Sequence, residues 1–260
     1  MFKSRLGALM DKPLMIPGTS NGRFYQFPNG DYVPSVTTVT SGGSPMSPWL
    51  LKYLIKEADG DYARFRQQSN EASRIGTYVH ELIESGLRGN PIALETPKVE
   101  VQRALISFSE WWNASDYKVV ELEKFLWSDI MEGKSLRYKF CGTADAILRD
   151  SDGKLVLADW KTSKAIDNSM ALQLSAYKIL WDATHDEKID RLLIVHCKKD
   201  FTKALPGKTF KAEHWMEYDP ESLYYCHKMF TQANANRFGK FEPSVKHIYP
   251  TEFKLEVRNA

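Results

Sequence analysis

The feature that most constrains the fold is a pair of apolar segments joined by a short polar turn. Residues 144–150 read ADAILRD and residues 154–161 read KLVLADWK, with SDG (151–153) between them. Two such runs around a Gly-containing loop predict a β-hairpin. A type I turn closed by a left-handed glycine uses three residues, and it pairs Asp150 with Lys154.

This turn decides which side chains face each other across the hairpin. Counting outward from the Asp150–Lys154 pair places Asp145 directly opposite Asp159, with Lys161 on the same face. A two-residue loop would shift the register by one and put the two aspartates on opposite faces. The three-residue turn therefore predicts a cluster of two carboxylates and one ammonium group on a sheet.

These charges need an explanation, because residues 155–158 (LVLA) before Asp159 are apolar. Burying unpaired charge is costly, and two facing carboxylates repel each other. A divalent cation removes the repulsion, and carboxylate oxygens favour Mg²⁺ or Mn²⁺. The lysine can polarise a water molecule or neutralise developing negative charge. A buried Asp–Lys ion pair is the alternative, and it leaves the second aspartate unexplained.

The remaining pattern favours a mixed α/β architecture around one sheet, in a single domain without internal repeats. We expect residues 1–44 to be irregular or partly extended, with a β-like stretch at 31–40. Ser47 resembles an N-cap before proline at the first helical position. The regular elements are predicted as helices at about 48–58, 61–88, 98–112, 168–182 and 219–235, and as strands at 117–127, 136–148, 154–161, 190–198 and about 208–216.

Net charge gives no sign of a nucleic-acid partner, because 35 Lys and Arg face 33 Asp and Glu. A basic surface would have to come from local clusters, each of which is also explained by ordinary solvated surface. The candidate clusters are Lys52/Lys56, Arg64/Arg66/Arg74 and Lys198/Lys199/Lys203/Lys208/Lys211.

The three cysteines Cys141, Cys197 and Cys226 are widely separated and cannot form a four-thiolate iron–sulfur or zinc site. No long apolar run is present, and the N-terminal segment is too soon interrupted for a signal peptide. We therefore expect a soluble, reduced, cytoplasmic protein with no membrane partner.

Two predicted helices carry polar side chains at helical spacing. Gln173 and Tyr177 are four residues apart and share a face, from which they could reach a phosphate or a base. A core tyrosine beside a surface glutamine is the plainer explanation. Gly76, His80 and Glu84 also share a face. An interior helix glycine costs about 1 kcal/mol relative to alanine, so we expect something to approach Gly76 closely.

Taken in order, these segments resemble the PD-(D/E)XK nuclease superfamily. The similar branch is that of RecB-like exonucleases, which includes many phage nucleases and the mitochondrial genome maintenance exonuclease. The matching segments are YVPSVTTVT (32–40), GTYVHELIE (76–84), ELEKFLWS (121–128), CGTADAIL (141–148), LADWKTSK (157–164), QLSAY (173–177) and LLIVHCKKD (192–200).

The resemblance implies a restriction-endonuclease-like core in which a mixed central β-sheet is flanked by helices, with an N-terminal helical region. The N-terminal extended and helical part would span 1–115, the catalytic sheet core 116–237 and a C-terminal tail 238–260. One departure is Ala144, which stands where the superfamily's name has proline.

The resemblance also implies roles at the metal centre. Asp145 and Asp159 would be metal ligands, together with the backbone carbonyl of Trp160. Lys161 would orient the attacking water or stabilise the transition state, and His80 would reach the metal from its helix. An additional acidic ligand is expected in the preceding strand, where Glu123 competes with Glu121.

Other positions would contact nucleic acid according to the same resemblance. Gln173 and Tyr177 match the QxxxY motif, which is similar to one that helps to hold the nucleic acid backbone, and Gly76, Thr162 and Ser163 are further candidates. Trp49, Tyr53 and Phe65 on the early helices could stack on bases, although packing in the core explains them equally well.

The expected function is a metal-dependent exonuclease that hydrolyses single-stranded or end-containing DNA with one or two Mg²⁺ or Mn²⁺ ions. The cysteine cluster of the iron–sulfur relatives is missing, so we expect no iron–sulfur cluster. A structure-specific or nicking endonuclease would share every site residue. A non-catalytic DNA-binding module for recombination or repair is the alternative from another class.

Overall fold

The computed structural model describes residues 13–19, 22–43, 48–56, 60–92, 98–132, 135–199, 211–214 and 220–238. Ser47, Lys203, Lys208 and the tail beyond Phe238 lie outside the described residues, as do the side chains of Trp49 and Lys211. Among the described helices, none combines the length and the apolar composition of a membrane span.

The centre of the fold is a mixed five-stranded sheet with strand order β4-β5-β6-β7-β8. Its strands are β4 (Lys118–Glu132), β5 (Ser135–Arg149), β6 (Leu155–Lys161), β7 (Arg191–His196) and β8 (Lys211–His214). Neighbouring strands are antiparallel except β6 and β7, which are parallel. A parallel pair needs a crossover connection, and helix α5 (Asn168–Thr184) supplies it.

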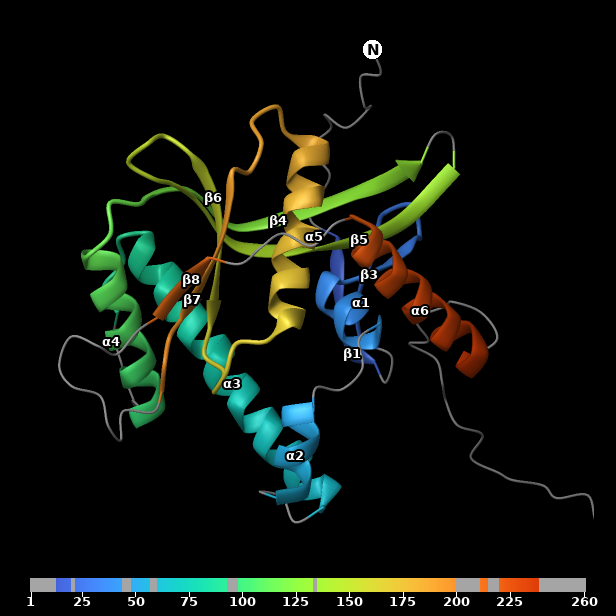
Figure 1. Cartoon of the computed structure of the whole chain (residues 1–260), viewed down its shortest axis with the longest axis horizontal. Helices are drawn as coiled ribbons and strands as arrows, with labels where there is room; N and C mark the ends of the chain where they lie inside the picture. The colour runs from blue at the N-terminus through green and yellow to red at the C-terminus, as the bar shows by residue number, and fades with distance from the viewer. Residues whose placement is uncertain are drawn as a thin grey trace, which may run out of the picture.

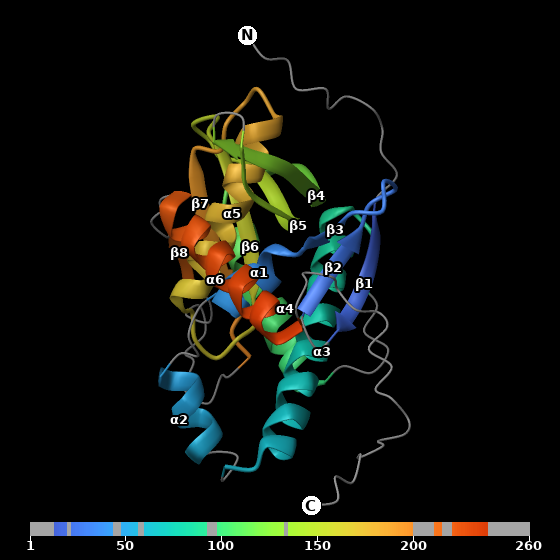
Figure 2. The ribbon, with the colours of Figure 1, turned by 90° about the vertical axis from the view of Figure 1, so that its right-hand side faces the viewer.

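Helices cover both faces of this sheet (Figures 1 and 2). On one face lie α3 (Tyr62–Leu87) and α4 (Val99–Asn113), over a core that we call the α3/α4-side core. On the other lie α5, α1 (Val36–Gly43) and α6 (Pro220–Phe238), over the α5-side core. The predicted α/β class, with a mixed sheet flanked by helices, is confirmed.

A helical arm extends beyond the sheet. Helix α2 (Pro48–Lys56) and the N-terminal part of α3 project to the lower end of the molecule in both views (Figures 1 and 2). Asp61 begins α3 as an N-cap, because its carboxylate accepts hydrogen bonds from the amides of Ala63 and Arg64. Proline occupies the first position of α2, as the sequence predicted.

The β-like stretch predicted at 31–40 is largely wrong. Only β3 (Tyr32–Pro34) is a strand, and α1 begins two residues later. The Ser35 hydroxyl oxygen accepts a 3.1 Å hydrogen bond from the Thr38 amide, as an N-cap does. Val36 and Val39 are buried against α5 and α6 in the α5-side core. Burial there overrides the weak helix propensity of the β-branched residues.

The expectation of one sheet also needs correction. β1 (Leu14–Thr19), β2 (Gly22–Gln26) and β3 form a second, antiparallel three-stranded sheet. Tyr25, Phe27 and Val33 of this region pack in a third cluster with Cys141 of β5. These strands are short, and their pattern alone did not distinguish them from irregular structure.

The hairpin between β5 and β6 has the predicted register. The Asp150 amide donates a 3.1 Å hydrogen bond to the Lys154 carbonyl, and Gly153 has φ +81°. Along the ladder, Ala146 pairs with Ala158. Asp145 and Asp159 therefore occupy the next pair of facing positions.

Candidate active site

Asp159 lies at the centre of the candidate site. Its neighbours Ala158 and Trp160 both belong to the α3/α4-side core. Because strand side chains alternate, Asp159 faces the opposite side, toward α5. The residue is 2% exposed. A carboxylate this deeply buried must be compensated by nearby positive charge or bound metal.

Asp145 is held by two groups from different elements. Its Oδ2 atom accepts a 2.8 Å hydrogen bond from the Trp160 amide of β6. The same oxygen lies 3.3 Å from Nδ1 of His80, which comes from α3. The structure therefore brings His80 to the predicted carboxylate pair, although 65 residues separate it from Asp145 in the sequence.

The charges of His80 and Asp145 stabilise each other. Burial by itself would lower the pKa of His80, but the Asp145 carboxylate overrides this and raises the pKa to about 9. Burial raises the pKa of Asp145, and the His80 charge more than offsets it, so the pKa lies below its usual value. The pair is an ion pair at neutral pH.

Lys161 connects Asp159 to helix α5. Its Nζ atom lies 2.5 Å from Asp159 Oδ2 and donates a 3.0 Å hydrogen bond to Gln173 Oε1. Gln173 Nε2 in turn donates a 3.2 Å hydrogen bond to the hydroxyl of Tyr177, which is 4% exposed. The QxxxY pair therefore positions Lys161 from the neighbouring helix, and its contact with nucleic acid stays a prediction.

Lys161 compensates the charge of the Asp159 carboxylate only in part. Burial, together with repulsion from Asp145, raises the pKa of Asp159 to about 6 against the opposing charge of Lys161. The buried Oδ2 atom has the Lys161 ammonium group as its ionic partner, 2.5 Å away. Such an oxygen beside a second carboxylate fits a hard divalent cation, for which oxygen is the preferred donor. Within the described residues, no three His, Cys, Asp or Glu side chains form a metal-binding group.

Two glycines allow the surrounding elements to approach the site. A Cβ atom on Gly76 of α3 would lie 3.2 Å from Oγ1 of Thr162, which follows β6. The close approach expected at Gly76 is thus confirmed. A Cβ atom on Gly142 of β5 would lie 2.9 Å from Cε1 of Tyr177. The sequence did not single out Gly142, because its contact with α5 depends entirely on how the helix packs.

The loop after β6 is anchored to the next strand. His196 at the end of β7 donates from Nε2 to the Ser163 carbonyl at 2.7 Å. His196 is 5% exposed and was not predicted from the sequence. Its place directly after the buried apolar run of β7 was the available signal. This anchor fixes the backbone that leads away from Lys161.

The two candidate glutamates of β4 differ in their surroundings. Glu121 Oε1 accepts a 2.9 Å hydrogen bond from Lys124 and pairs in register with Ile147. Glu123 lies between residues paired with Ala144 and Ala146, so its facing position is that of Asp145. The register therefore favours Glu123 as the additional acidic residue, and its role as a ligand stays a prediction.

The backbone is irregular at this level of the sheet. Ala144 and Ile147 are three residues apart in β5, yet both contribute to the α5-side core. Across the ladder, Leu122 packs on the α3/α4-side core and Leu126 on the α5-side core. Regular alternation would put Ala144 and Ile147 on opposite faces of the sheet. It would put Leu122 and Leu126 on the same face. Glu123 has φ +49°, a strained value for a non-glycine residue, so the reversal of faces coincides with the site.

We expect the stability of the metal-free protein to depend on His80. Its folded pKa of about 9 exceeds the ordinary value of 6.5, so its contribution is complete below pH 6.5 and is lost as the pH rises to 9. The loss is on the order of 3 kcal/mol. Urea unfolding in EDTA across this range should show it in the wild type and not in His80→Gln. If the free energy of unfolding changed equally with pH in both proteins, the ion pair would be contradicted.

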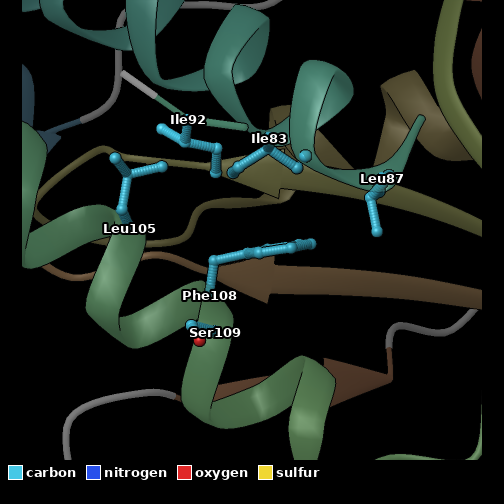
Figure 3. A pocket seen from close by; sticks show the side chains of 7 residues that line it. Ile83, Leu87, Ile92, Leu105, Phe108 and Ser109 are labelled. Atoms are coloured by element: carbon cyan, nitrogen blue, oxygen red, sulfur yellow. The ribbon is translucent and has the colours of Figure 1, made fainter. Parts of the chain in front are cut away.

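An apolar pocket lies apart from the charged cluster, between α3 and α4 (Figure 3). Its volume is about 180 Å³, and its lining is Ile83, Gly86, Leu87, Ile92, Leu105, Phe108 and Ser109. The lining carries no charged side chain, so this pocket lacks the groups that bind phosphate.

A comparison with family models identifies the superfamily of the chain. The family model of the PD-(D/E)XK nuclease superfamily matches residues 48–246. No curated protein matches the chain. A crystal structure of SSO0001 is similar with a TM-score of 0.42 and 18% sequence identity, over 75% of this chain and 74% of that chain. The family model covers well over half of the sequence, and the chain therefore belongs to the PD-(D/E)XK nuclease superfamily.

Proposed function

We propose that this protein is a metal-dependent exonuclease that hydrolyses phosphodiester bonds of single-stranded or end-containing DNA. The observation that carries the nuclease proposal is the pair of facing carboxylates, the partly buried Asp145 and the buried Asp159, with the Lys161 ammonium group 2.5 Å from Asp159 Oδ2. The exonuclease activity and the DNA substrate rest on the resemblance to the RecB-like branch.

Asp145 and Asp159 are the proposed ligands of one or two Mg²⁺ or Mn²⁺ ions. The Trp160 carbonyl, Glu123 and His80 are proposed to complete or border this centre. A bound divalent cation supplies Lewis acidity, which polarises a phosphoryl oxygen and lowers the pKa of water. The hard oxygen donors of the two aspartates suit these cations.

The protein's own side chains position the groups that take part in the proposed hydrolysis. Lys161 stays protonated, because Asp159 raises its pKa against the effect of burial. Its ammonium group is held between Asp159 and Gln173, where it can donate to the attacking water or to an oxygen that gains negative charge. His80 holds the Asp145 carboxylate through Oδ2.

The segment around Lys161 is proposed to receive the nucleic acid backbone. Gly76 and Thr162 lie where α3 approaches the end of β6, with Ser163 next in the chain. From α5, Gln173 hydrogen-bonds to Lys161 and is itself backed by the buried Tyr177. Contacts of this kind orient the phosphodiester for in-line attack without reading the base sequence.

The test is hydrolysis of linear single-stranded, linear duplex and closed circular DNA, with end-labelled linear substrates and with Mg²⁺, Mn²⁺ or EDTA. Single-stranded RNA of the same sequence is the fourth substrate. We expect metal-dependent loss of linear DNA while circles remain intact. Cutting of circles would replace the exonuclease by an endonuclease, and cleavage of RNA alone would overturn the DNA substrate. Metal-independent DNA binding without hydrolysis would leave a non-catalytic module.

A further inference from the structure

Two lysines outside the proposed catalytic cluster emerge from neighbouring strand ends. Strands β6 and β7 are parallel, and Lys161 pairs with His196 at their carboxyl ends. Lys164 follows the first strand end by three residues, and Lys199 follows the second by three. The carboxyl ends of parallel neighbours lie at the same edge of the sheet, so both lysines leave the sheet beside Lys161.

The backbone that carries each lysine is fixed from outside its own segment. Before Lys164, the Ser163 carbonyl accepts the 2.7 Å hydrogen bond from His196. Helix α4 holds the segment after β7. Ser107 Oγ donates a 3.1 Å hydrogen bond to the Lys198 carbonyl. Arg103 Nη1 donates a 3.4 Å hydrogen bond to the Lys199 carbonyl. Both strand ends are therefore held in place by tertiary contacts.

The two positive charges act on each other. Lys199 is partly buried, and burial lowers its pKa; Lys164 adds to this effect and Glu100 opposes it. Lys164 Nζ lies 5.3 Å from the ring centroid of Tyr53 on α2. In the described part of the chain, no carboxylate lies within ion-pair distance of either lysine. Two like charges held together in this way favour the binding of an anion.

We propose that Lys164 and Lys199 form a binding subsite for a backbone phosphate next to the scissile one. The inference deepens the proposed nuclease function, on which it rests. The subsite would hold the strand by charge alone, so it would be indifferent to base sequence. The Tyr53 contact ties α2 to the same loop, which gives the helical arm a defined position beside the bound strand.

The test measures binding separately from hydrolysis. A fluorescent single-stranded DNA oligonucleotide is titrated with full-length protein in EDTA, from about 50 to 200 mM NaCl. The variants are Lys164→Gln, Lys199→Gln and the double variant. Lys154→Gln is the matched control, because this exposed lysine lies at the other end of β6, roughly 23 Å from Lys161 at the usual rise per residue. Circular dichroism verifies that each variant is folded.

We expect the slope of log affinity against log salt to fall by about 0.7 for each lysine removed, and to stay unchanged in Lys154→Gln. A neutral methylphosphonate at the linkage next to the scissile one should slow cleavage by the wild type and leave the double variant unaffected. An unchanged salt slope in the double variant overturns the subsite, even if the wild type hydrolyses DNA. A reduced salt slope in the double variant, without hydrolysis by the wild type, supports phosphate binding by the two lysines. That result overturns only the proposed nuclease function.

Discussion

Asp159→Asn is expected to lower metal-dependent hydrolysis by at least about 10²- to 10³-fold. The substitution removes the negative charge that the proposed cation needs, while the side chain keeps its shape. It also removes the ionic partner 2.5 Å from Lys161, so the lysine loses its fixed position. The rate is measured on the linear substrate at saturating Mg²⁺, with wild type in parallel.

Asp152→Asn is the matched control for this substitution. Asp152 lies in the turn of the same hairpin, is exposed, and is far along the strands from the carboxylate pair. Its removal should leave the rate unchanged. Full activity of Asp159→Asn would refute the proposed centre. Thermal unfolding monitored by circular dichroism separates a loss of chemistry from a loss of structure.

Trp160→Ala is expected to destabilise the protein by about 3–5 kcal/mol. The Trp160 side chain is 2% exposed and sits in the α3/α4-side core. Its ring centroid lies 5.0 Å from that of Phe108 and 5.8 Å from that of Trp111, both on α4. Alanine would leave a large cavity between the sheet and this helix. Urea unfolding gives the change in the free energy of unfolding.

The exposed Ile106 on α4 provides the comparison for this core substitution. Ile106 is 50% exposed, so Ile106→Ala should change stability by less than about 0.5 kcal/mol. Trp160→Ala should also reduce hydrolysis below its unfolding temperature, because the Trp160 side chain packs the stretch of β6 whose backbone amide, kept in the variant, must stay in place to hold Asp145. A stability loss no larger than that of Ile106→Ala would show that the aromatic contacts contribute little.

The core of the site could be predicted because it depends on local geometry. A three-residue turn fixes strand register, and register fixes which side chains face each other. The glycine at 153 was enough to place Asp145 opposite Asp159 and Lys161 on their face. The helix that carries Gln173 and Tyr177 was equally accessible, because a four-residue spacing on a helix does not depend on distant contacts.

The N-terminal region was harder to predict for the opposite reason. The valines and threonines of α1 favour strands by their own propensity, and only burial against α5 and α6 makes them helical. The small sheet of β1–β3 depends on packing against Cys141, which lies more than 100 residues away in the sequence. Contacts of this range leave no periodic pattern in a short segment.

The sequence by itself determined the hairpin register, the pair of facing aspartates and the spacing of the polar residues on α5, because each follows from neighbours along the chain. Only the tertiary structure decided that His80 forms an ion pair with Asp145 and that Tyr177 packs against Gly142. The same is true of the break in side-chain alternation at Glu123. These features arise where separate elements pack together. Such packing depends on the whole core, and no short segment encodes it.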